Sequence, residues 1–456
     1  MKDGCSTVSV RGREVTRPRF NLPLADIYFG VGLFLILAES FFYNYIAALA
    51  HSPFWVRSVI GYNLFPSEIW FIFGGVVFVC LLLISANYKI SKYSISDIKP
   101  IFLIISVYSL SFLYGFGLGN DGALQAFREM VFGSLCLPAI LLLAPYLRKK
   151  VVVKFFYVGC MVTVIWVFIA VRERFILETV GVRLVHNAFL LIMPFFVSFY
   201  LMYALIMQRL YFVLAIVMII PFLVAFSKLS VVTLIFSVFA CVALSGLFDK
   251  ENRNFILSIF RARKIVYAIA FITIAIVGLY FISVLSGGII ENRIRTTFFK
   301  ERINFHGEIF YGDVTGGRFA FWKASVAEFL NKPVSGYGLG AVIKAYSHGE
   351  KEMWHIHNYF FQSLHNTGLI GILLILGGWY FWCNKILRKL LAIHDCHNKI
   401  LLASMLVFVA NLMFYGLYAQ ALSYPPVSIF FWLCIGVLSA SKKSNSSNIN
   451  QIFIQT

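Results

Sequence analysis

The residues best suited to chemistry lie in one stretch of the chain, from Gly316 to Gly371. Near its start, the guanidinium of Arg318 is always charged and can hold two phosphate oxygens at once. Towards its end, the imidazole of His357 can accept a proton from a hydroxyl, since a free imidazole has a pKa of about 6.5. A cation beside such a base would favour a displacement in which negative charge grows on a leaving phosphate. The plainer alternatives are an exposed loop arginine and a histidine that only supports a helix start.

Two polar residues after His357 extend this candidate site. Asn358 can orient the imidazole ring or a substrate. A helix that begins near Trp354 would place His357, Phe361 and His365 on one face, because residues four apart share a helix face. His365 is therefore a further substrate-binding candidate.

The residues between Arg318 and His357 predict the elements that hold this site. Apolar side chains recur at helical spacing, which predicts an amphipathic helix at the membrane surface; they are Phe319, Trp322, Val326, Phe329 and Leu330. The sequence Asn331-Lys332-Pro333 ends this helix, since proline lacks a donor and disfavours helix before it. Three glycines then allow turns or close backbone approach, namely Gly336, Gly338 and Gly340.

Composition places these residues in a membrane protein. Of 456 residues, 60% are apolar and 13% are charged, whereas soluble chains carry about a quarter charged residues. The apolar residues fall into runs of about 16–23, the length that crosses a hydrocarbon core as a helix. We predict about twelve spans, at residues 24–46, 67–86, 101–116, 130–146, 151–171, 187–206, 210–226, 229–247, 265–285, 367–384, 400–418 and 425–440.

The placement of basic residues predicts how these spans are oriented. The net charge of +19 does not indicate a nucleic-acid partner, because basic residues of membrane proteins gather in cytoplasmic loops. With the N-terminus inside, 24 of the 39 lysines and arginines fall in inner segments, six in short outer loops and nine in the long outer loop. This bias predicts that both termini are cytoplasmic.

The predicted fold class is an all-α integral membrane protein with one large outer loop that contains amphipathic helices. Residues 1–285 hold spans one to nine, residues 286–366 form the loop, residues 367–440 hold spans ten to twelve, and residues 441–456 form a disordered tail. The loop is too long to be a mere connection. No outer loop holds a cysteine and no Cys/His spacing fits a metal, so we expect neither a disulfide nor a bound metal.

The stretch that carries the candidate site resembles the signature region of the O-antigen ligase and O-antigen polymerase superfamily. The matching residues are GRFAFWKASVAEFLNKPVSGYGLG followed by HNYFFQSLHNTGLIG. The shared pattern has an arginine, a tryptophan, an Asn/His-Pro-x-x-Gly-x-Gly run, a His-Asn pair and a Gly-Leu-Ile-Gly helix start. Arg318 matches the family arginine and His357 the family histidine, whereas Lys332, which separates the asparagine from the proline, is a departure.

The resemblance implies an inner-membrane glycosyltransferase of the GT-C type, with its active site in the periplasmic loop and no metal or other cofactor. Such an enzyme takes glycans linked to undecaprenyl pyrophosphate and polymerises repeat units of O-antigen, capsular polysaccharide or exopolysaccharide. The alternative is a ligase that transfers the glycan to lipid A-core, and the quoted residues do not separate the two. The expected partners are the lipid-linked donor, the glycan acceptor, membrane lipids and a chain-length regulator. The expected localisation is the bacterial inner membrane.

Other outer cations would line a site beside Arg318. Arg128, in LQAFREMVF, resembles a family arginine in the matching outer position. Arg183 and His186, in GVRLVHNAF, form a similar outer cluster. Lys228, in AFSKLS, stands where the family often has a Ser-Arg pair, and lysine loses the bidentate geometry. For each of these residues the plainer alternative is an interfacial anchor or a charged span end.

A second class of function, a transporter or flippase for lipid-linked glycans, also fits twelve spans with both termini inside. Such a protein would need ionisable groups within several spans, yet Glu39 is the one carboxylate deep in a predicted span. We expect Glu39 to form an ion pair with an arginine or to orient an acceptor. The scarcity of charge inside the spans and the large motif-bearing loop favour the enzyme.

Overall fold

Helices form most of the structure, a computed structural model that describes residues 21–42, 64–84, 92–147, 149–171, 188–207, 211–225, 228–248, 301–303, 309–311, 318–346, 350–353, 358–417 and 421–441. A helix satisfies its own backbone hydrogen bonds, which suits the long apolar runs of this chain. Up to residue 248 the helices are α1 (Asn21–Phe41), α3 (Pro66–Glu68) with the π-helical segment η1 (Ile69–Gly74), α4 (Gly75–Ile84), α5 (Lys92–Gly117), α6 (Ala123–Met130), the 3-10 segment η2 (Phe132–Cys136), α7 (Leu137–Leu143) with the 3-10 turn η3 (Ala144–Tyr146), α8 (Lys149–Val171), α9 (Ala188–Ile206), α10 (Tyr211–Ala225) and α11 (Lys228–Phe248).

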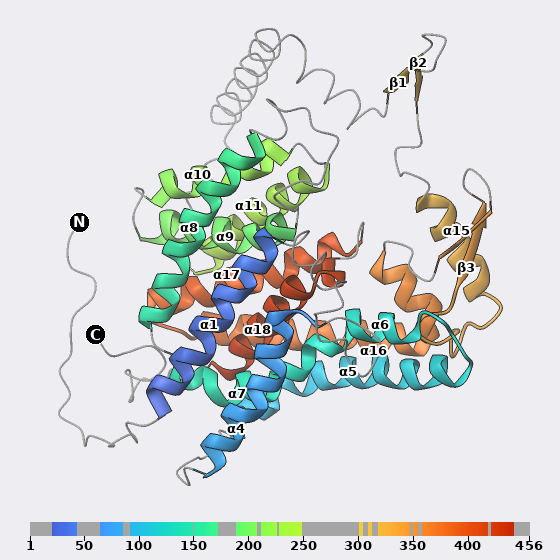
Figure 1. Ribbon diagram of the computed structural model, residues 1–456, viewed down its shortest axis with the longest axis horizontal. Coiled ribbons are helices and arrows are strands. Elements are labelled where there is room, and N and C mark those ends of the chain that lie inside the picture. The colour runs from blue at the N-terminus through green and yellow to red at the C-terminus, as the bar shows by residue number, and fades with distance from the viewer. Residues whose placement is uncertain are drawn as a thin grey trace, which may run out of the picture.

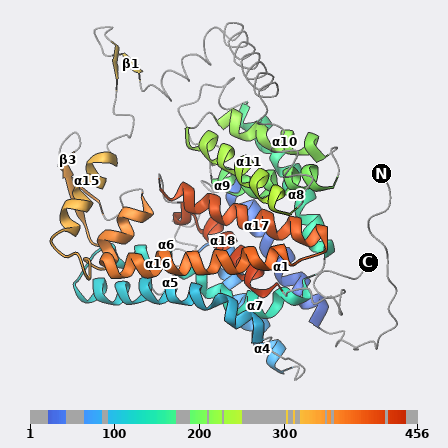
Figure 2. The same cartoon turned by 180° about the vertical axis from the view of Figure 1, so that it is seen from behind.

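Among the described residues after 300, the structure has two hairpins and four longer helices. These elements are β1 (Glu301–Ile303), β2 (Ile309–Tyr311), α15 (Arg318–Phe329), β3 (Ile343–Tyr346), β4 (Glu350–Met353), α16 (Tyr359–Leu391), α17 (Cys396–Tyr415), the 3-10 turn η6 (Ala421–Ser423) and α18 (Pro425–Ala440). Helix α16 lies along α5, and α15 with β3 lies next to one end of this pair (Figure 1). Figure 2 shows from behind that α17 runs next to α16.

Four of the described helices are long and apolar enough to cross a membrane, within Ser96–Gly117, Ala188–Ile206, Tyr359–Leu391 and Cys396–Tyr415. A fifth crossing results if α6 and the helix that follows it count as one bent span. Helices also occupy the other predicted spans that the structure describes, while the span predicted at 265–285 lies outside the described residues. The chain is therefore a mostly helical protein with several candidate membrane spans, and twelve crossings stay a prediction.

The span predicted at 130–146 is not one straight helix. The chain bends by 45° between α6 and the helix that begins at Phe132, because Val131 leaves the helical backbone with a φ of −123°. After the bend, Gly133 packs so closely on α18 that a β-carbon there would lie 2.6 Å from Trp432. Packing against α18 accompanies the bend, and an apolar run alone does not reveal such packing.

One end of the helical bundle is held by a buried lysine. The Nζ atom of Lys389, near the end of α16, lies 2.7 Å from a carboxylate oxygen of Asp97 on α5. It also donates to the backbone oxygens of Leu438 and Ser439 on α18. The start of α5 and the ends of α16 and α18 therefore meet here, and all three were predicted to lie inside.

The other end, which we call the motif end, contains Gly117, Asn358 and Leu417. The amide of Asn120, just after α5, donates to the backbone oxygens of Tyr337 and Leu339 at 3.0 and 3.2 Å. Residues predicted to lie outside thus meet at this end. The relative arrangement of α5, α16 and α18 agrees with the predicted alternation, while the side that faces the periplasm stays a prediction.

Helix α9 also begins at the motif end. Its later part contacts the start of α17, where the Tyr203 hydroxyl bonds with the His397 ring. Its earlier part contacts α17 further along, where the rings of Phe195 and Phe408 lie 6.2 Å apart. The two helices are therefore antiparallel, and Ala188 lies near the end of α17.

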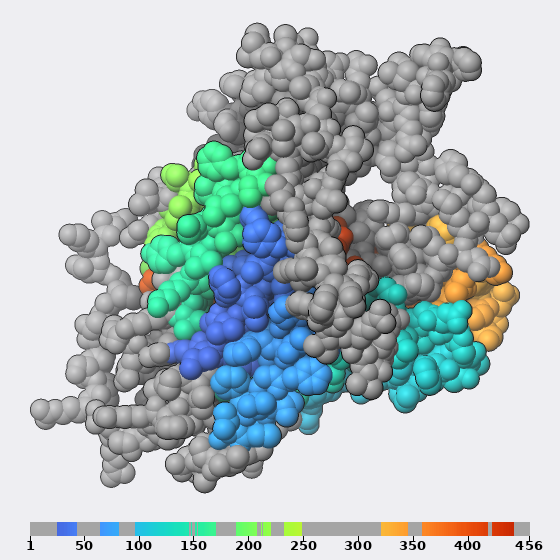
Figure 3. Space-filling view, viewed as in Figure 1, coloured from blue at the N-terminus to red at the C-terminus, as the bar shows by residue number. Residues whose placement is uncertain are grey.

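Figure 3 shows another helix pair of the bundle, α1 and α8, side by side.

Helix α11 also begins at the motif end, because it too runs antiparallel to α17. Lys399, near the start of α17, lies 5.3 Å from the ring centre of Phe248 at the end of α11. Asn411, near the end of α17, donates to the backbone oxygen of Thr233 at 2.8 Å. The antiparallel register places Lys228, the first residue of α11, near the end of α17.

The glycine run after α15 makes the close approaches that the sequence predicts. Gly336, Gly338 and Gly340 have φ values of 67°, 81° and 77°, a region that favours glycine. A β-carbon would lie 2.4 Å from Gly115 on α5 if it stood at Gly338, and 2.1 Å from Ala123 on α6 if it stood at Gly340. The loop therefore ties α5 and α6 to the segment that follows α15.

Replacing Gly340 by alanine should destabilise the protein by about 2 kcal/mol or more, since strained backbone and overlap with Ala123 both add cost. A thermal unfolding scan in detergent measures this effect as a lower Tm. Gly377→Ala is the matched control, because a β-carbon at this glycine of α16 meets nothing within 4 Å. Equal Tm values for the two variants would contradict the close approach at Gly340.

Helix α15 ends at Phe329, just before Asn331-Lys332-Pro333, as predicted, and it also buries a side that the prediction did not include. Val326 is 37% exposed, whereas Phe321 and Ser325 are buried. Phe321 packs against Ile343 of β3, a partner that helical spacing cannot reveal.

The long loop also contains strands, which the sequence analysis missed. Strands β1 and β2 pair antiparallel, with Arg302 opposite Phe310. Strands β3 and β4 pair in the same way, with Lys344 opposite Glu352. These strands are three or four residues long, too short to give a clear alternating pattern.

Candidate functional site

Two contacts determine how α15 lies on α16. The rings of Trp322 and Phe361 are 5.9 Å apart, and further along both helices Glu328 Oε2 lies 2.9 Å from His365 Nε2. Both contacts advance in the same chain direction, so the two helices are parallel here and begin at the same end. Arg318, the first residue of α15, therefore lies at the end where α16 begins, and its side chain is outside the described part.

Helix α16 begins at a later residue than the sequence predicted. The helix begins at Tyr359, not near Trp354, because Asn358 has an extended backbone and caps the helix by accepting from the Phe361 backbone N–H at 3.0 Å. Asparagine is a favoured residue at this position. The predicted helical face that included His357 is therefore wrong, and His357 itself lies outside the described residues.

The contacts of Asn358 are those of a structural residue. Its side-chain oxygen caps α16, and its side-chain nitrogen donates to the backbone oxygen of Leu417 at 2.8 Å. The next residue, Tyr359, donates its backbone N–H to Gly416 at 2.8 Å. Asn358, the residue directly after His357, thus fixes the start of α16 to the end of α17.

In this structure His365 stabilises the packing of the loop, whereas the sequence predicted a contact with a substrate. The side chain is fully buried, with its Nε2 atom next to Glu328 of α15 and its Nδ1 atom 3.1 Å from the side-chain oxygen of Asn366. The ring of Tyr337 stacks on it, with centres 4.8 Å apart and planes 8° apart. His365 therefore joins α15, the glycine loop and α16.

Replacing His365 by alanine should lower stability by about 2 kcal/mol, since a buried ring and its hydrogen bonds are lost. The change is measured as a fall in Tm in detergent, and any loss of activity should follow the loss of folded protein. His394→Ala is the control, because that side chain is exposed. A variant that keeps its Tm and loses activity would instead indicate a substrate contact.

The other predicted cations fall into two groups. Lys228 begins α11 at the motif end, although its side chain is outside the described part. Arg183 and His186 lie outside the described residues, shortly before Ala188, where α9 begins at the motif end. The starts of α9 and α11, which are close in sequence to these candidates, therefore lie at the motif end. The side chains of the candidates are outside the described part.

Arg128 is bound by a carboxylate, whereas the sequence predicted a cation available for a substrate. Its Nη2 and Nε atoms donate to Glu68 at 2.9 and 3.3 Å, and the two side chains are 21% and 5% exposed. The guanidinium also lies 5.7 Å from the ring centre of Phe65. Because Glu68 balances its charge, Arg128 is less suited to a pyrophosphate than predicted.

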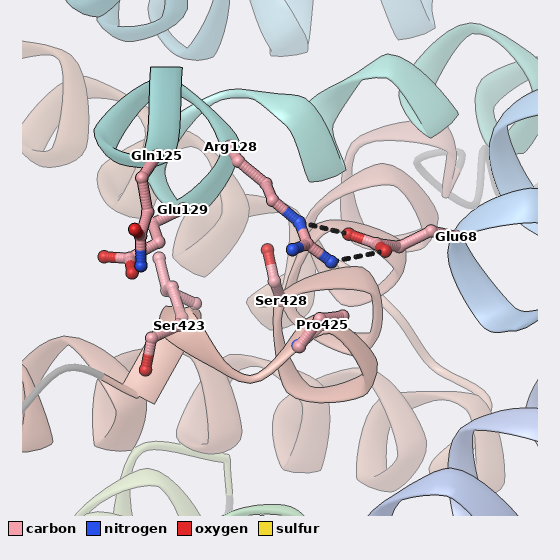
Figure 4. Close-up of a pocket in the computed structure, with 8 residues that line it drawn as sticks. Glu68, Gln125, Arg128, Glu129, Ser423, Pro425 and Ser428 are labelled. Carbon is pink, nitrogen blue, oxygen red and sulfur yellow. Dashed lines mark hydrogen bonds and ion pairs between the residues drawn. The ribbon is translucent and has the colours of Figure 1, made fainter. Parts of the chain in front are cut away.

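A pocket opens beside this ion pair, where the bend after α6 meets η6 and the start of α18 (Figure 4). Its volume is about 310 Å³, counting the space at its open mouth. It is lined by Glu68, Gln125, Arg128, Glu129, Leu422, Ser423, Pro425 and Ser428. Arg128 is the one predicted site residue in this lining.

Two residues of the pocket were missed by the sequence analysis. Glu129 and Ser428 are buried, and the Oε2 and Oγ atoms, respectively, have no hydrogen-bond partner among the described residues. Figure 4 shows Glu129 next to Gln125, whose side chain hydrogen-bonds to the carboxyl. The signal in the sequence was an Arg-Glu pair directly before the predicted span 130–146.

Glu39 is buried but pairs with no arginine among the described residues. It accepts hydrogen bonds from the backbone N–H and the hydroxyl of Ser67 at 2.6 and 2.5 Å. Glu39 therefore joins the end of α1 to the start of α3, while the ion pair with an arginine stays a prediction. Glu68 and Glu129 are buried too, so Glu39 is not alone as a buried carboxyl.

The pocket belongs to the motif end. The Tyr359 hydroxyl accepts from the backbone N–H of Leu422, which lines the pocket, at 2.8 Å. The start of α16, directly after the His-Asn pair, therefore touches the pocket wall. The motif end thus combines helix starts that bear cations with a polar pocket, an arrangement suited to binding an anionic headgroup and sugar hydroxyls. A comparison of this chain with models of known protein families and with curated proteins found no match.

Proposed function

We propose that this chain is a membrane glycosyltransferase that polymerises glycan repeat units carried on undecaprenyl pyrophosphate. A hydroxyl of the acceptor sugar attacks the anomeric carbon of the donor, forms the new glycosidic bond and displaces the lipid pyrophosphate with inversion. His357 accepts the hydroxyl proton, and Arg318 binds the pyrophosphate as its negative charge grows. The motif from Gly316 to Gly371 is the reason for these two assignments.

One arrangement supports this proposal most. The helix starts that bear Arg318 and Lys228 lie at the motif end, together with Asn358, which directly follows His357. A lipid headgroup at one membrane surface could meet all of them, because one end of each span faces that surface. Arg128 contributes less to pyrophosphate binding, since Glu68 already binds it.

The surroundings of the site are suited to a lipid substrate. Apolar side chains on the outside of α5, such as Leu110 and Leu113, are more than 60% exposed and would contact lipid chains, including a polyprenyl tail. We place the reaction at the periplasmic face of a bacterial inner membrane, on the predicted charge bias. A chain-length regulator is the protein partner that this reaction would call for.

A ligase that transfers the glycan to lipid A-core is the alternative within the same chemistry. A strain that lacks the gene distinguishes the two through its lipopolysaccharide on a gel. Core with a single repeat unit indicates that a polymerase was lost. Core alone, with polymer still on the lipid carrier, indicates that a ligase was lost.

A transporter or flippase is a second candidate because the bent span lines a pocket with a buried carboxyl. Discontinuous helices with such groups are typical of transport sites. Glycosyl transfer by the purified protein in detergent decides between the two, since detergent abolishes the two compartments that transport needs. Lengthened glycans support the enzyme, and their absence in every preparation would support transport.

A further inference from the structure

The pocket at the bend after α6 contains two buried polar atoms that the proposed reaction does not use. Glu129 is 6% exposed and Ser428 is 4% exposed. The Oε2 atom of the first and the Oγ atom of the second have no hydrogen-bond partner among the described residues. Buried polar atoms are almost always hydrogen-bonded in folded proteins, so these two atoms point to a bound group with hydrogen-bonding capacity.

The charges around the pocket disfavour an anion. The single guanidinium, that of Arg128, is already held at two points by Glu68. Glu129 adds a second carboxyl to the same lining. A phosphate would therefore meet one cation whose charge Glu68 already balances, an unfavourable arrangement for an anion. Arg318 is a better candidate than Arg128 for binding the pyrophosphate.

The ligand set disfavours a metal ion and a lipid tail. Calcium and magnesium take about six oxygen ligands or more, and this pocket offers two unpartnered oxygens. Within the part of the chain that the structure describes, no three His, Cys, Asp or Glu side chains are grouped for a metal. A polyprenyl tail would leave the carboxyl of Glu129 unsatisfied.

Sugar hydroxyls satisfy each group that the pocket presents. A carboxyl oxygen accepts from a hydroxyl, and the serine hydroxyl can donate or accept. The apolar side chains of Leu422 and Pro425 can cover the carbon face of a ring.

We propose that this pocket is a subsite for one sugar residue of the lipid-linked glycan, with Glu129 and Ser428 bonded to its hydroxyls. This inference rests on the proposed function. The position of the pocket agrees with it, because Leu422 of its wall is bonded to Tyr359, two residues after His357. The subsite binds and orients the glycan, while proton transfer belongs to His357.

The test measures glycan extension by the purified full chain in detergent. The substrate is undecaprenyl-pyrophosphate-linked repeat units isolated from cells that lack this chain. Glu129→Gln should raise KM for these units by about threefold to tenfold, since the amide replaces one oxygen of the carboxyl with an NH2 group that cannot accept a hydrogen bond. Its kcat should stay within about threefold of the wild-type value, because the lost hydrogen bond stabilises the bound substrate and the transition state equally. Ser428→Ala should raise KM by about threefold to tenfold.

Ser404→Ala is the matched control, because Ser404 is a buried serine that does not line the pocket. Its KM should equal that of the wild type. Size-exclusion profiles and Tm values in detergent show whether each variant is folded. If Glu129→Gln destabilises the chain, Ser428→Ala carries the test, since its hydroxyl has no partner among the described residues to lose.

Each outcome decides something definite. Folded variants at Glu129 and Ser428 with the KM of the wild type would overturn the subsite, because the two atoms would then only be hydrated. A fall in kcat with an unchanged KM would also overturn it and would assign Glu129 to the chemistry. A requirement for sodium, tested by replacing it with N-methylglucamine, would favour a cation site instead. A wild-type protein that extends no glycan would contradict the proposed function itself.

Discussion

Replacing Arg318 by alanine is expected to lower the rate of glycan transfer by about 100-fold or more, the usual cost of removing a group that stabilises growing negative charge. In the proposed reaction the guanidinium would bind the pyrophosphate at two points, and its charge does not depend on pH. Cells that carry this variant should lack long-chain surface polysaccharide. The measurement is the chain-length ladder on a gel, with an immunoblot to show that the protein is present in the membrane.

Two further substitutions make the Arg318 experiment specific. Arg318→Lys keeps the charge and loses the two-point geometry, so its activity should fall between those of alanine and the wild type. Lys323→Ala removes an exposed cation from the same helix and should leave the ladder unchanged. Full activity of Arg318→Lys would argue against two-point binding, and a normal ladder from Arg318→Ala would remove the residue from the mechanism.

Replacing His357 by alanine is expected to lower the rate by about 10²- to 10⁴-fold, the range that general base catalysis contributes. Without the imidazole, the acceptor hydroxyl keeps its proton as it attacks, which makes it a poor nucleophile. Asn358 and the start of α16 should remain in place, since their contacts to Leu417 and Gly416 do not involve the imidazole. The initial rate of glycan extension by purified protein measures the effect.

The choice of substitution separates the two roles open to His357. Glutamine can still form hydrogen bonds but cannot take up a proton, so His357→Gln should be about as slow as His357→Ala if the residue is a base. His355→Ala, two residues earlier, serves as the neighbouring control and should keep wild-type activity. A His357→Gln variant with most of its activity would show that the histidine only positions a substrate.

Local sequence rules predicted those features of the fold that depend on the backbone itself. The apolar runs gave the helices, because length and hydropathy suffice for a span. Pro333 gave the end of α15 within a few residues, since proline cannot continue a helix. Gly336, Gly338 and Gly340 gave the tight loop, because only glycine readily adopts positive φ values against a neighbouring backbone.

Features that depend on a distant partner could not be predicted from spacing. The buried side of α15 is set by Ile343, a residue of a short strand. The predicted face with His365 failed because Asn358 caps α16, which excludes His357 from the helix. Glu129 was overlooked because α18 covers the bend beside it, and no pattern around residue 129 reveals that contact.

The most direct test of the central claim, that Arg318 and His357 serve one reaction, is a double-mutant comparison. It measures the rate of glycan extension by purified wild type, Arg318→Ala, His357→Ala and the double variant, with lipid-linked repeat units as substrate. Residues that act in the same step give strongly non-additive losses, so the double variant should be about as slow as the slower single variant. Wild-type rates in either single variant, or losses that multiply in the double variant, would contradict a shared site.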